Sequence, residues 1–421
     1  MLQLLGIRDR RYAALVVGTG FAGGLVGAAY LGLLRVVDRL LGPDAWAALP
    51  HLVVLAAVGL AVAGITRLLG NPPNVELLVA NIHVLGGSKD VRSLRSLLPI
   101  SLVCVGSGGA LGPEAPLVQT TGSLGTAIAQ RAKLPRSQVR VITISGMAAG
   151  FTVLFGAPIG AALFALEILH RRGLQYYEAL VPSLVGAVCG QAVYVLVTGA
   201  GLQPVFRLPA AGDLRALDLA WAGAAGVIGA AVAWTFTYLS RALQRAARVL
   251  PDTVRPVVGG ATLGLLALWT PYALTNGERQ VDQIVAAKVT VAALLVAVVG
   301  KLLGTTVTMA AGWRGGFIIP LFFIGATLGV LVHRLAPGAD QAALIAGLMV
   351  ACNVGVTKTP LGSTLVVSEM AGLALLPTTL IAALVSLVLT SPVALIHTQR
   401  QREEDDADEP PLLDRTTGEA A

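Results

Sequence analysis

The sequence contains few charged residues. They make up 13% of its 421 residues, about half of the roughly 25% typical of soluble domains. Runs of 23, 26, 28 and 30 uncharged residues separate Arg11 from Arg35, Arg140 from Glu167, Glu178 from Arg207 and Glu369 from Arg400. A soluble protein with buried helices would need a solvated face on each helix, which such runs do not provide. Runs of about 20 apolar residues instead cross a membrane as helices, because lipid offers the backbone no other hydrogen-bond partner.

Cysteine is also scarce, and recognisable cofactor motifs are nearly absent. The three cysteines Cys104, Cys189 and Cys352 lie far apart in apolar runs, which excludes a disulfide framework and a metal-ligand spacing. A G-x-G-x-x-G pattern begins at Gly18, but it lies inside an uncharged run and favours close helix packing over a dinucleotide site. We therefore expect no metal, no cofactor and no enzymatic activity.

The charges that are present divide the chain into a basic body and an acidic end. The formal net charge is +7, yet the residues after Gln401 include eight acids and two arginines, a net charge of −6. Basic clusters in an apolar chain are typical of loops that face the cytoplasm, and they do not indicate nucleic-acid binding. The excess of arginine over lysine suggests a bacterial protein, which we expect to be a multi-pass protein of the cytoplasmic membrane. The clusters lie at residues 8–11, 131–140, 171–172 and 241–255.

Two pairs of matching segments reveal an internal repeat. Residues 158–167 and 360–369 both fit P-[IL]-G-x2-L-x3-E, at an offset of 202 residues, and Pro116-Leu117 and Pro320-Leu321 begin a second pair at an offset of 204. Duplicated halves with broken helices are typical of transporters and channels. We therefore predict an all-α polytopic membrane protein with two inverted-topology repeats that meet at a central anion site. Its expected parts are a cytoplasmic N-terminus (1–11), a first repeat (12–210), a second repeat (211–399) and a disordered acidic cytoplasmic tail (400–421).

The stretch from Gly106 to Pro116 contains the most informative single residue. Glu114 follows Pro113 at a predicted helix start and is flanked by uncharged runs of 18 and 16 residues. An ionisable residue at membrane depth is costly and indicates function. A helix N-terminus also attracts anions, so Glu114 would occupy the place of an anion until it swings away or is protonated. The alternative is a carboxylate that only caps its own helix.

Two further breaks interrupt the apolar runs. Residues 312–320 match the Glu114 stretch in the second half and again end in a proline, Pro320, but contain no acid. The half-helices of the two halves would aim their N-termini at one point from opposite sides. The third break, residues 69–74, contains Asn71, which could cap the following helix and donate its amide; a tight turn is the alternative.

Over residues 10–400 the chain resembles the CLC family of chloride channels and transporters. The family's Gly-Arg-Glu-Gly-Pro motif is similar to Gly112-Pro113-Glu114-Ala115-Pro116, its Gly-x-Phe-x-Pro loop to Gly316–Pro320, and its Gly-Ser-Gly-Ile-Pro loop to residues 70–74. The resemblance implies a homodimer in a lipid bilayer, one pore per subunit, chloride as the ion and Glu114 as the gate and proton acceptor. The anion-binding residues it implies are Asn71, Gly112, Ala115, Gly316, Phe317, Ile318 and Ile319.

Several family residues differ in this chain. Asn71 replaces the anion-binding serine, no tyrosine follows Tyr272, Pro113 removes one backbone donor, and Ile168 stands where antiporters have their inner proton-transfer glutamate. We therefore expect anion binding to depend on helix N-termini, and passive Glu114-gated flow in preference to exchange. Open alternatives are a chloride or fluoride antiporter, since some fluoride exporters also have Asn after that Gly, and an anion-binding paralogue without flux. Glu167 and Glu369 are expected to be structural, at helix ends.

Overall fold

The computed structural model describes residues 10–73, 75–88, 94–171, 174–199, 206, 208–286 and 289–399, almost entirely as helices. The expectations for residues 1–9 and 400–421 therefore lie outside the described residues. Short 3-10 turns lie at Pro43–Ala45, Tyr177–Ala179, Pro271–Ala273 and Leu373–Leu375. The α-helices are α1 (Arg10–Leu41), α2 (Ala48–Leu69), α3 (Val75–Leu85), α4 (Leu94–Gly106), α5 (Glu114–Arg131), α6 (Arg136–Phe155), α7 (Pro158–Glu167), α8 (Leu180–Thr198), α9 (Ala216–Ala247), α10 (Arg255–Trp269), α11 (Glu278–Ala286), α12 (Val291–Ala310), α13 (Ile318–Leu335), α14 (Gln341–Thr357), α15 (Pro360–Ala371) and α16 (Leu376–Thr390).

Eight helical segments of the described chain are long and apolar enough to cross a membrane, so the prediction of a polytopic α-helical membrane protein is confirmed. Not every apolar run forms one span. The apolar residues 97–130 are divided into α4 and α5, and the apolar residues 284–312 include the end of α11 and all of α12. The expected division of the chain at residue 210 falls between α8 and α9.

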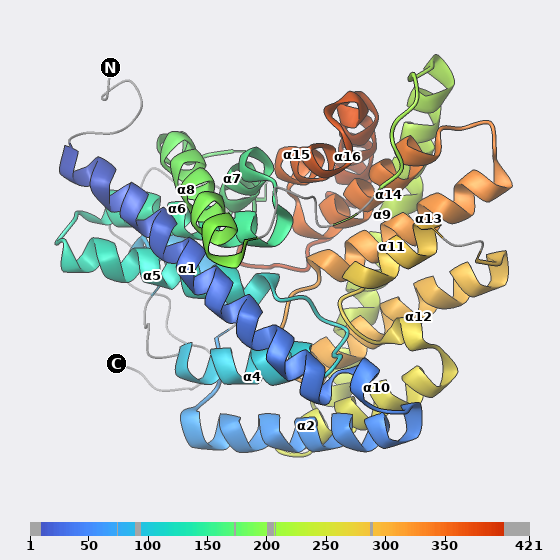
Figure 1. Cartoon of the computed structure of the whole chain (residues 1–421), viewed down its shortest axis with the longest axis horizontal. Helices are drawn as coiled ribbons and strands as arrows, with labels where there is room; N and C mark the ends of the chain where they lie inside the picture. Colours follow the sequence, from blue (N-terminus) through green and yellow to red (C-terminus); the bar gives the residue numbers. More distant parts are fainter. Residues whose placement is uncertain are drawn as a thin grey trace.

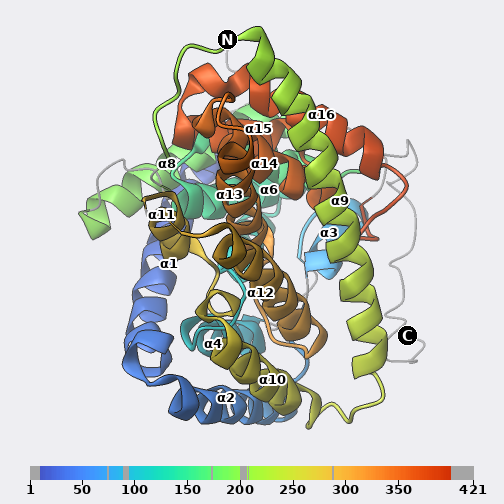
Figure 2. The ribbon, with the colours of Figure 1, turned by 90° about the vertical axis from the view of Figure 1, so that its right-hand side faces the viewer.

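The two halves of the sequence lie beside each other. Helices α1 and α4 to α8 fill the left of Figure 1 and α11 to α16 the right, while α2 and α10 pack together along the bottom of both views (Figures 1 and 2). The G-x-G-x-x-G segment packs as expected, because a Cβ on Gly20 would lie 2.7 Å from the Cβ of Cys189 in α8.

Helices α7 and α15 show the repeat in three dimensions. Each begins at a proline, and the preceding helix ends in the left-handed conformation, at Gly156 (φ 65°) and at Lys358 (φ 62°). The two helices then cap each other. The carboxylate of Glu167 accepts N–H bonds from the start of α15 at 3.1 and 2.6 Å, and that of Glu369 accepts two from the start of α7 at 3.4 and 2.5 Å. These contacts agree with the structural role expected for both acids.

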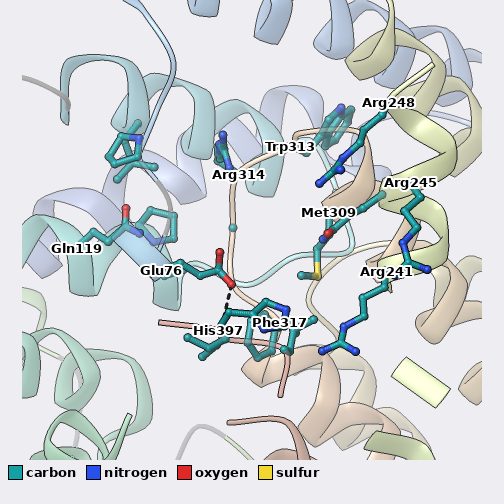
Figure 3. A pocket seen from close by; sticks show the side chains of 18 residues that line it. Glu76, Gln119, Arg241, Arg245, Arg248, Met309, Trp313, Arg314, Phe317 and His397 are labelled. Carbon is teal, nitrogen blue, oxygen red and sulfur yellow. Dashed lines mark hydrogen bonds between the residues drawn. The ribbon is translucent and has the colours of Figure 1, made fainter. Parts of the chain in front are cut away.

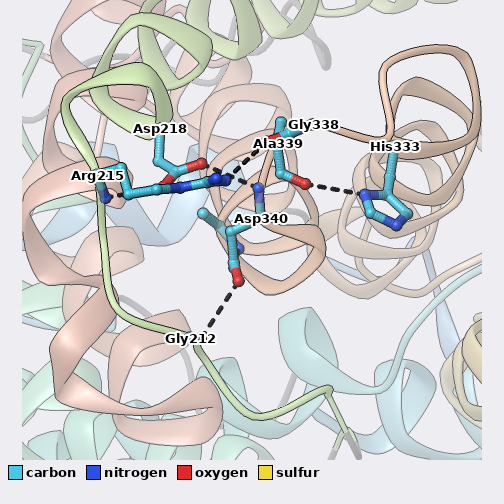
Figure 4. A network of polar contacts seen from close by, with 8 residues as sticks. Gly212, Arg215, Asp218, His333, Gly338, Ala339 and Asp340 are labelled. Carbon is cyan, nitrogen blue, oxygen red and sulfur yellow. Dashed lines mark hydrogen bonds and ion pairs between the residues drawn. The ribbon is translucent and has the colours of Figure 1, made fainter.

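A second polar network fixes the start of α9 to the loop between α13 and α14 (Figure 4). Asp218 accepts from the backbone N–H of Arg215 and of Asp340, both at 2.9 Å. Asp340 in turn accepts from the N–H of Ala343 at 2.8 Å and so caps α14. Each aspartate thus satisfies N–H groups that have no partner within their own helix, and together they fix the second half at one end.

Replacing Gly160 by alanine is expected to destabilise the fold. Its Cβ would overlap the backbone of Val366 in α15, and overpacking of this kind costs about 1–3 kcal/mol. We expect a lower midpoint when the fraction of monodisperse protein is measured after heating in detergent. Gly64→Ala in α2 is the matched control, because its Cβ meets nothing within 4 Å. Equal midpoints for the two variants would refute the close packing of α7 on α15.

Candidate functional site

Two interrupted helices, α4–α5 in the first half and α12–α13 in the second, contact each other through the loops at which they are interrupted. The loop between α4 and α5 and the loop between α12 and α13 form an antiparallel bridge, in which the N–H of Gly112 donates to the carbonyl of Gly316 at 2.8 Å and the N–H of Gly316 donates back at 2.6 Å. Each loop turns at a glycine with positive φ, Gly108 (95°) and Gly312 (82°). The bridge brings the N-termini of α5 and α13 together, as the sequence predicted for the two half-helices.

Glu114 is the first residue of α5, and its side chain lies against the N-terminus of α13. Its side chain is 0% exposed, and its Oε1 accepts a hydrogen bond from the N–H of Ile319, in the first turn of α13, at 2.8 Å. Its Oε2 has no hydrogen-bond partner among the described residues. The carboxylate therefore caps a helix of the other half and lies where the dipole and free N–H groups would hold an anion.

Two glycines form a slot for this carboxylate. A Cβ on Gly316 would lie 2.5 Å from Cδ of Glu114, and one on Gly112 would overlap its Oε2. Both positions must therefore be glycine while the carboxylate is in place. Their N–H groups are used by the bridge, so in this structure Gly112 and Gly316 enclose the carboxylate without donating to it.

A small cavity of about 30 Å³ adjoins the slot. One water molecule needs about 10–15 Å³ of such space, so the cavity can hold one or two small occupants. Its polar side chains are those of Glu114 and Gln119, and four of the residues expected to bind the anion line it: Ala115, Gly316, Phe317 and Ile318. Their role as anion ligands stays a prediction. The remaining lining is Leu78, Val118, Met147, Phe151, Ile168 and Ile396.

A vestibule of about 740 Å³ adjoins this cavity and shares four lining residues with it, Ala115, Gln119, Phe317 and Ile396. It is strongly cationic (Figure 3). Its only lining carboxylate among the described residues, that of Glu76, accepts the backbone N–H of His397 at 3.2 Å. A cationic cavity of this kind concentrates anions. The basic side chains are those of Arg241, Arg245, Arg248 and Arg314.

The structure does not bring Asn71 to this site. Asn71 lies exposed in the loop after α2, lines neither cavity and makes no hydrogen bond to the described residues. Its role as an anion ligand therefore stays a prediction.

Sequence reasoning missed Gln119 and the function of the vestibule arginines. Gln119, 4% exposed, lines both cavities, and its Oε1 has no partner among the described residues. The arginines of α9 were noticed only as a basic cluster. Their spacing of four and then three residues places them on one helix face, and that signal was available in the sequence.

No group of three metal-ligating side chains forms in the described part of the chain.

Comparison with known proteins gives a consistent result. A family model described as voltage gated chloride channel matches residues 79–391. A chloride/fluoride channel protein of Pseudomonas syringae pv. tomato is 30% identical over 377 residues, covering 82% of this chain and 78% of that protein. The voltage-gated ClC-type chloride channel ClcB of Citrobacter koseri is 31% identical over 315 residues, 72% of this chain and 73% of that one.

Solved structures share the fold. A CLC-type fluoride/proton antiporter superposes with a TM-score of 0.80 at 22% identity, covering 95% of this chain and 98% of that chain. A slow cyanobacterial Cl⁻/H⁺ antiporter gives a TM-score of 0.77 at 21% identity, covering 90% and 95%. The predicted fold, two inverted repeats with broken helices around a central site, is confirmed. Together with the family match, these similarities show that the chain belongs to the CLC family of voltage-gated chloride channels.

Proposed function

We propose that this protein carries a small anion across the membrane along a pathway that Glu114 closes. The observation that supports this most directly is the hydrogen bond from the N–H of Ile319 to the carboxylate of Glu114, inside a slot between two glycines. A carboxylate and a mobile anion compete for the same helix N-terminus. Movement or protonation of Glu114 would free that position.

The cavities provide the rest of the pathway. An anion that enters the vestibule meets four arginines, then the small cavity, then the slot. With the carboxylate displaced, the N–H of Ile319 and the backbone of Phe317 and Ile318 at the start of α13 become available to the ion. Gln119 supplies the one amide side chain of the small cavity, and we include it among the anion ligands.

We further propose chloride as the ion and passive flow as the mode. Ile168 lines the small cavity, so an apolar side chain takes the place where a proton-transfer carboxylate would act. The lining offers few donors, which suits chloride better than fluoride, because fluoride holds its hydration shell more strongly and needs more donors to replace it.

The second candidate is proton-coupled exchange of chloride or fluoride. It is supported by the antiporters of similar fold and by the chloride/fluoride channel protein among the relatives. In that case Glu114 would also be the proton acceptor. An anion-binding protein without flux is the remaining alternative, and a flux measurement separates it from both.

Orientation and assembly complete the proposal. The arginines at the end of α9 belong to the clusters that predict a cytoplasmic side, so the vestibule would open to the cytoplasm of a bacterial cell.

We propose a homodimer in the bilayer with one pathway per subunit. Ile159 and Leu361, equivalent positions of the two repeats, are 51% and 40% exposed and provide apolar surface for lipid or a second subunit.

Glu114→Gln is expected to raise chloride efflux from proteoliposomes and to remove its dependence on pH. In the parent protein, efflux should increase as pH falls, because protonation removes the charge that holds the carboxylate at α13. Glutamine keeps an acceptor oxygen for the N–H of Ile319 but lacks the charge. A hydrogen bond to a charged group contributes about 1.5–3 kcal/mol and a neutral one about 0.5–1.5 kcal/mol, so the weaker bond allows an increase of about tenfold. Chloride, fluoride and external pH should be recorded together.

Asp213→Asn is the matched control, since Asp213 is exposed, lines neither cavity and precedes α9, at the end opposite to the vestibule arginines. Proton uptake that accompanies parental efflux and vanishes in Glu114→Gln would replace the channel proposal by exchange. Flux of fluoride alone would replace chloride. Binding without flux of either ion would refute transport.

Gly316→Ala is expected to open the pathway through steric displacement. The added methyl would lie 2.5 Å from Cδ of Glu114, and the flexible side chain is the group that can yield. Efflux should change in the same direction as in Glu114→Gln, and Gly316→Ala should add nothing in a Glu114→Ala background. Gly18→Ala, whose Cβ meets nothing within 4 Å, controls for the substitution. A further change in the Glu114→Ala background would contradict the slot.

A further inference from the structure

The vestibule has more positive charge than the described chain neutralises, since its lining contains four arginines and one carboxylate. Arg245 and Arg248 are exposed and make no hydrogen bond or ion pair with the described residues. Arg241 beside them donates to the carbonyl of Ala394, and Figure 3 shows the three along one helix. Basic residues at a helix C-terminus suit the helix dipole, which accounts for these positions on α9. It does not account for Arg314, which lies in the loop before α13 and lines the same cavity.

The C-terminal segment of the described chain runs through this vestibule. Leu395, Ile396 and His397 line it, and the N–H of His397 donates to Glu76. Two residues later the amide of Gln399 donates to the carbonyls of Ile168 at 3.0 Å and Thr357 at 2.8 Å. The chain therefore leaves the vestibule at His397 and is fixed immediately before residue 400 beside Ile168, which lines the adjoining small cavity.

The sequence that follows has the opposite charge. Eight acids and two arginines come after Gln401, and four of the acids are consecutive, Glu403 to Asp406. The four residues from Gln399 to Glu403 span at most about 14 Å. Gln399 is bonded to Ile168, which lines the small cavity beside the vestibule, so the first acids lie within reach of the vestibule. Tethering by so short a segment gives an effective concentration of the order of millimolar.

We propose that the acidic segment 403–409 binds in the arginine-lined vestibule of its own chain and competes there with the transported anion. Carboxylates form bidentate pairs with guanidinium groups, and they would lower the positive potential that concentrates anions. The inhibition would weaken as salt rises, because added anions compete and charges are screened. The effect on flux rests on the proposed anion transport, whereas the binding itself does not.

The first test compares chloride efflux for the full chain and a variant that ends at Gln401. In vesicles of zwitterionic lipid at low ionic strength, truncation should raise efflux by roughly three- to tenfold, since the tethered competitor is lost. The difference should shrink at high salt. The quadruple variant Glu403→Gln, Glu404→Gln, Asp405→Asn, Asp406→Asn should reproduce most of the increase at full length. Equal efflux from the full and truncated chains at low salt would overturn the proposal.

A double-mutant cycle locates the interaction. In the Arg245→Gln, Arg248→Gln background, truncation should change efflux much less than in the parent. A truncation effect of the same size in both backgrounds would show that the acidic segment acts elsewhere, and would also overturn the proposal.

Direct binding distinguishes failure of this inference from failure of the proposed function. A fluorescently labelled peptide of residues 402–421 should bind the truncated protein in neutral detergent, as measured by anisotropy. Binding should decrease with salt and be weaker for the peptide with Glu403 to Asp406 neutralised. This result requires no flux and would stand if the protein conducted neither chloride nor fluoride. Absence of binding at low ionic strength would overturn the inference.

Discussion

The fold depends on satisfying helix ends that lie at membrane depth. Lipid provides no hydrogen-bond partner for a broken helix, so irregular backbone persists there only where protein encloses it. The paired exchange of N–H bonds between Gly112 and Gly316 provides that enclosure. It joins loops 204 residues apart in the sequence and fixes the start of α5 against the start of α13. Without this contact neither half-helix would have a defined N-terminus, and the carboxylate of Glu114 would have no slot.

In the described chain three buried or half-buried glutamates cap helices of the opposite repeat, but they differ in how many of their oxygens are hydrogen-bonded. Glu167 uses both carboxylate oxygens, on two N–H groups of α15, and Glu369 does the same at α7. Glu114 uses one oxygen, on Ile319, and its other oxygen is unpaired among the described residues. Displacing it therefore breaks one hydrogen bond and relieves a buried acceptor that has none. The same chemistry thus gives two fully bonded caps, at Glu167 and Glu369, and one half-bonded cap at Glu114, which suits the gating role proposed for it.

Sequence reasoning identified the repeat, the broken helices and Glu114 because each has a local signal: a spaced motif, a glycine-proline interruption, and an acid between long uncharged runs. It also predicted that Ala115, Phe317 and Ile318 would come together, and they do. It gave no reason to pair Gly112 with Gly316, since that contact depends on how the halves pack. Asn71 was chosen by its place in a motif, yet the loop leaves it exposed. Gln119 was overlooked because one polar residue in a helix carries no signal until the cavity beside it is seen.

The lining of the small cavity determines one physical quantity, the number of donors available to a dehydrated ion. Apolar Ile168 and Ile396 line the small cavity, and Gln119 is its one amide side chain. A site with so few donors binds an anion weakly, and weak binding favours rapid release as long as ions are supplied. The wide arginine-lined vestibule supplies them by raising the local anion concentration. The proposed pathway thus separates two tasks: the vestibule charges attract the anion, and a carboxylate at a single helix N-terminus closes the path.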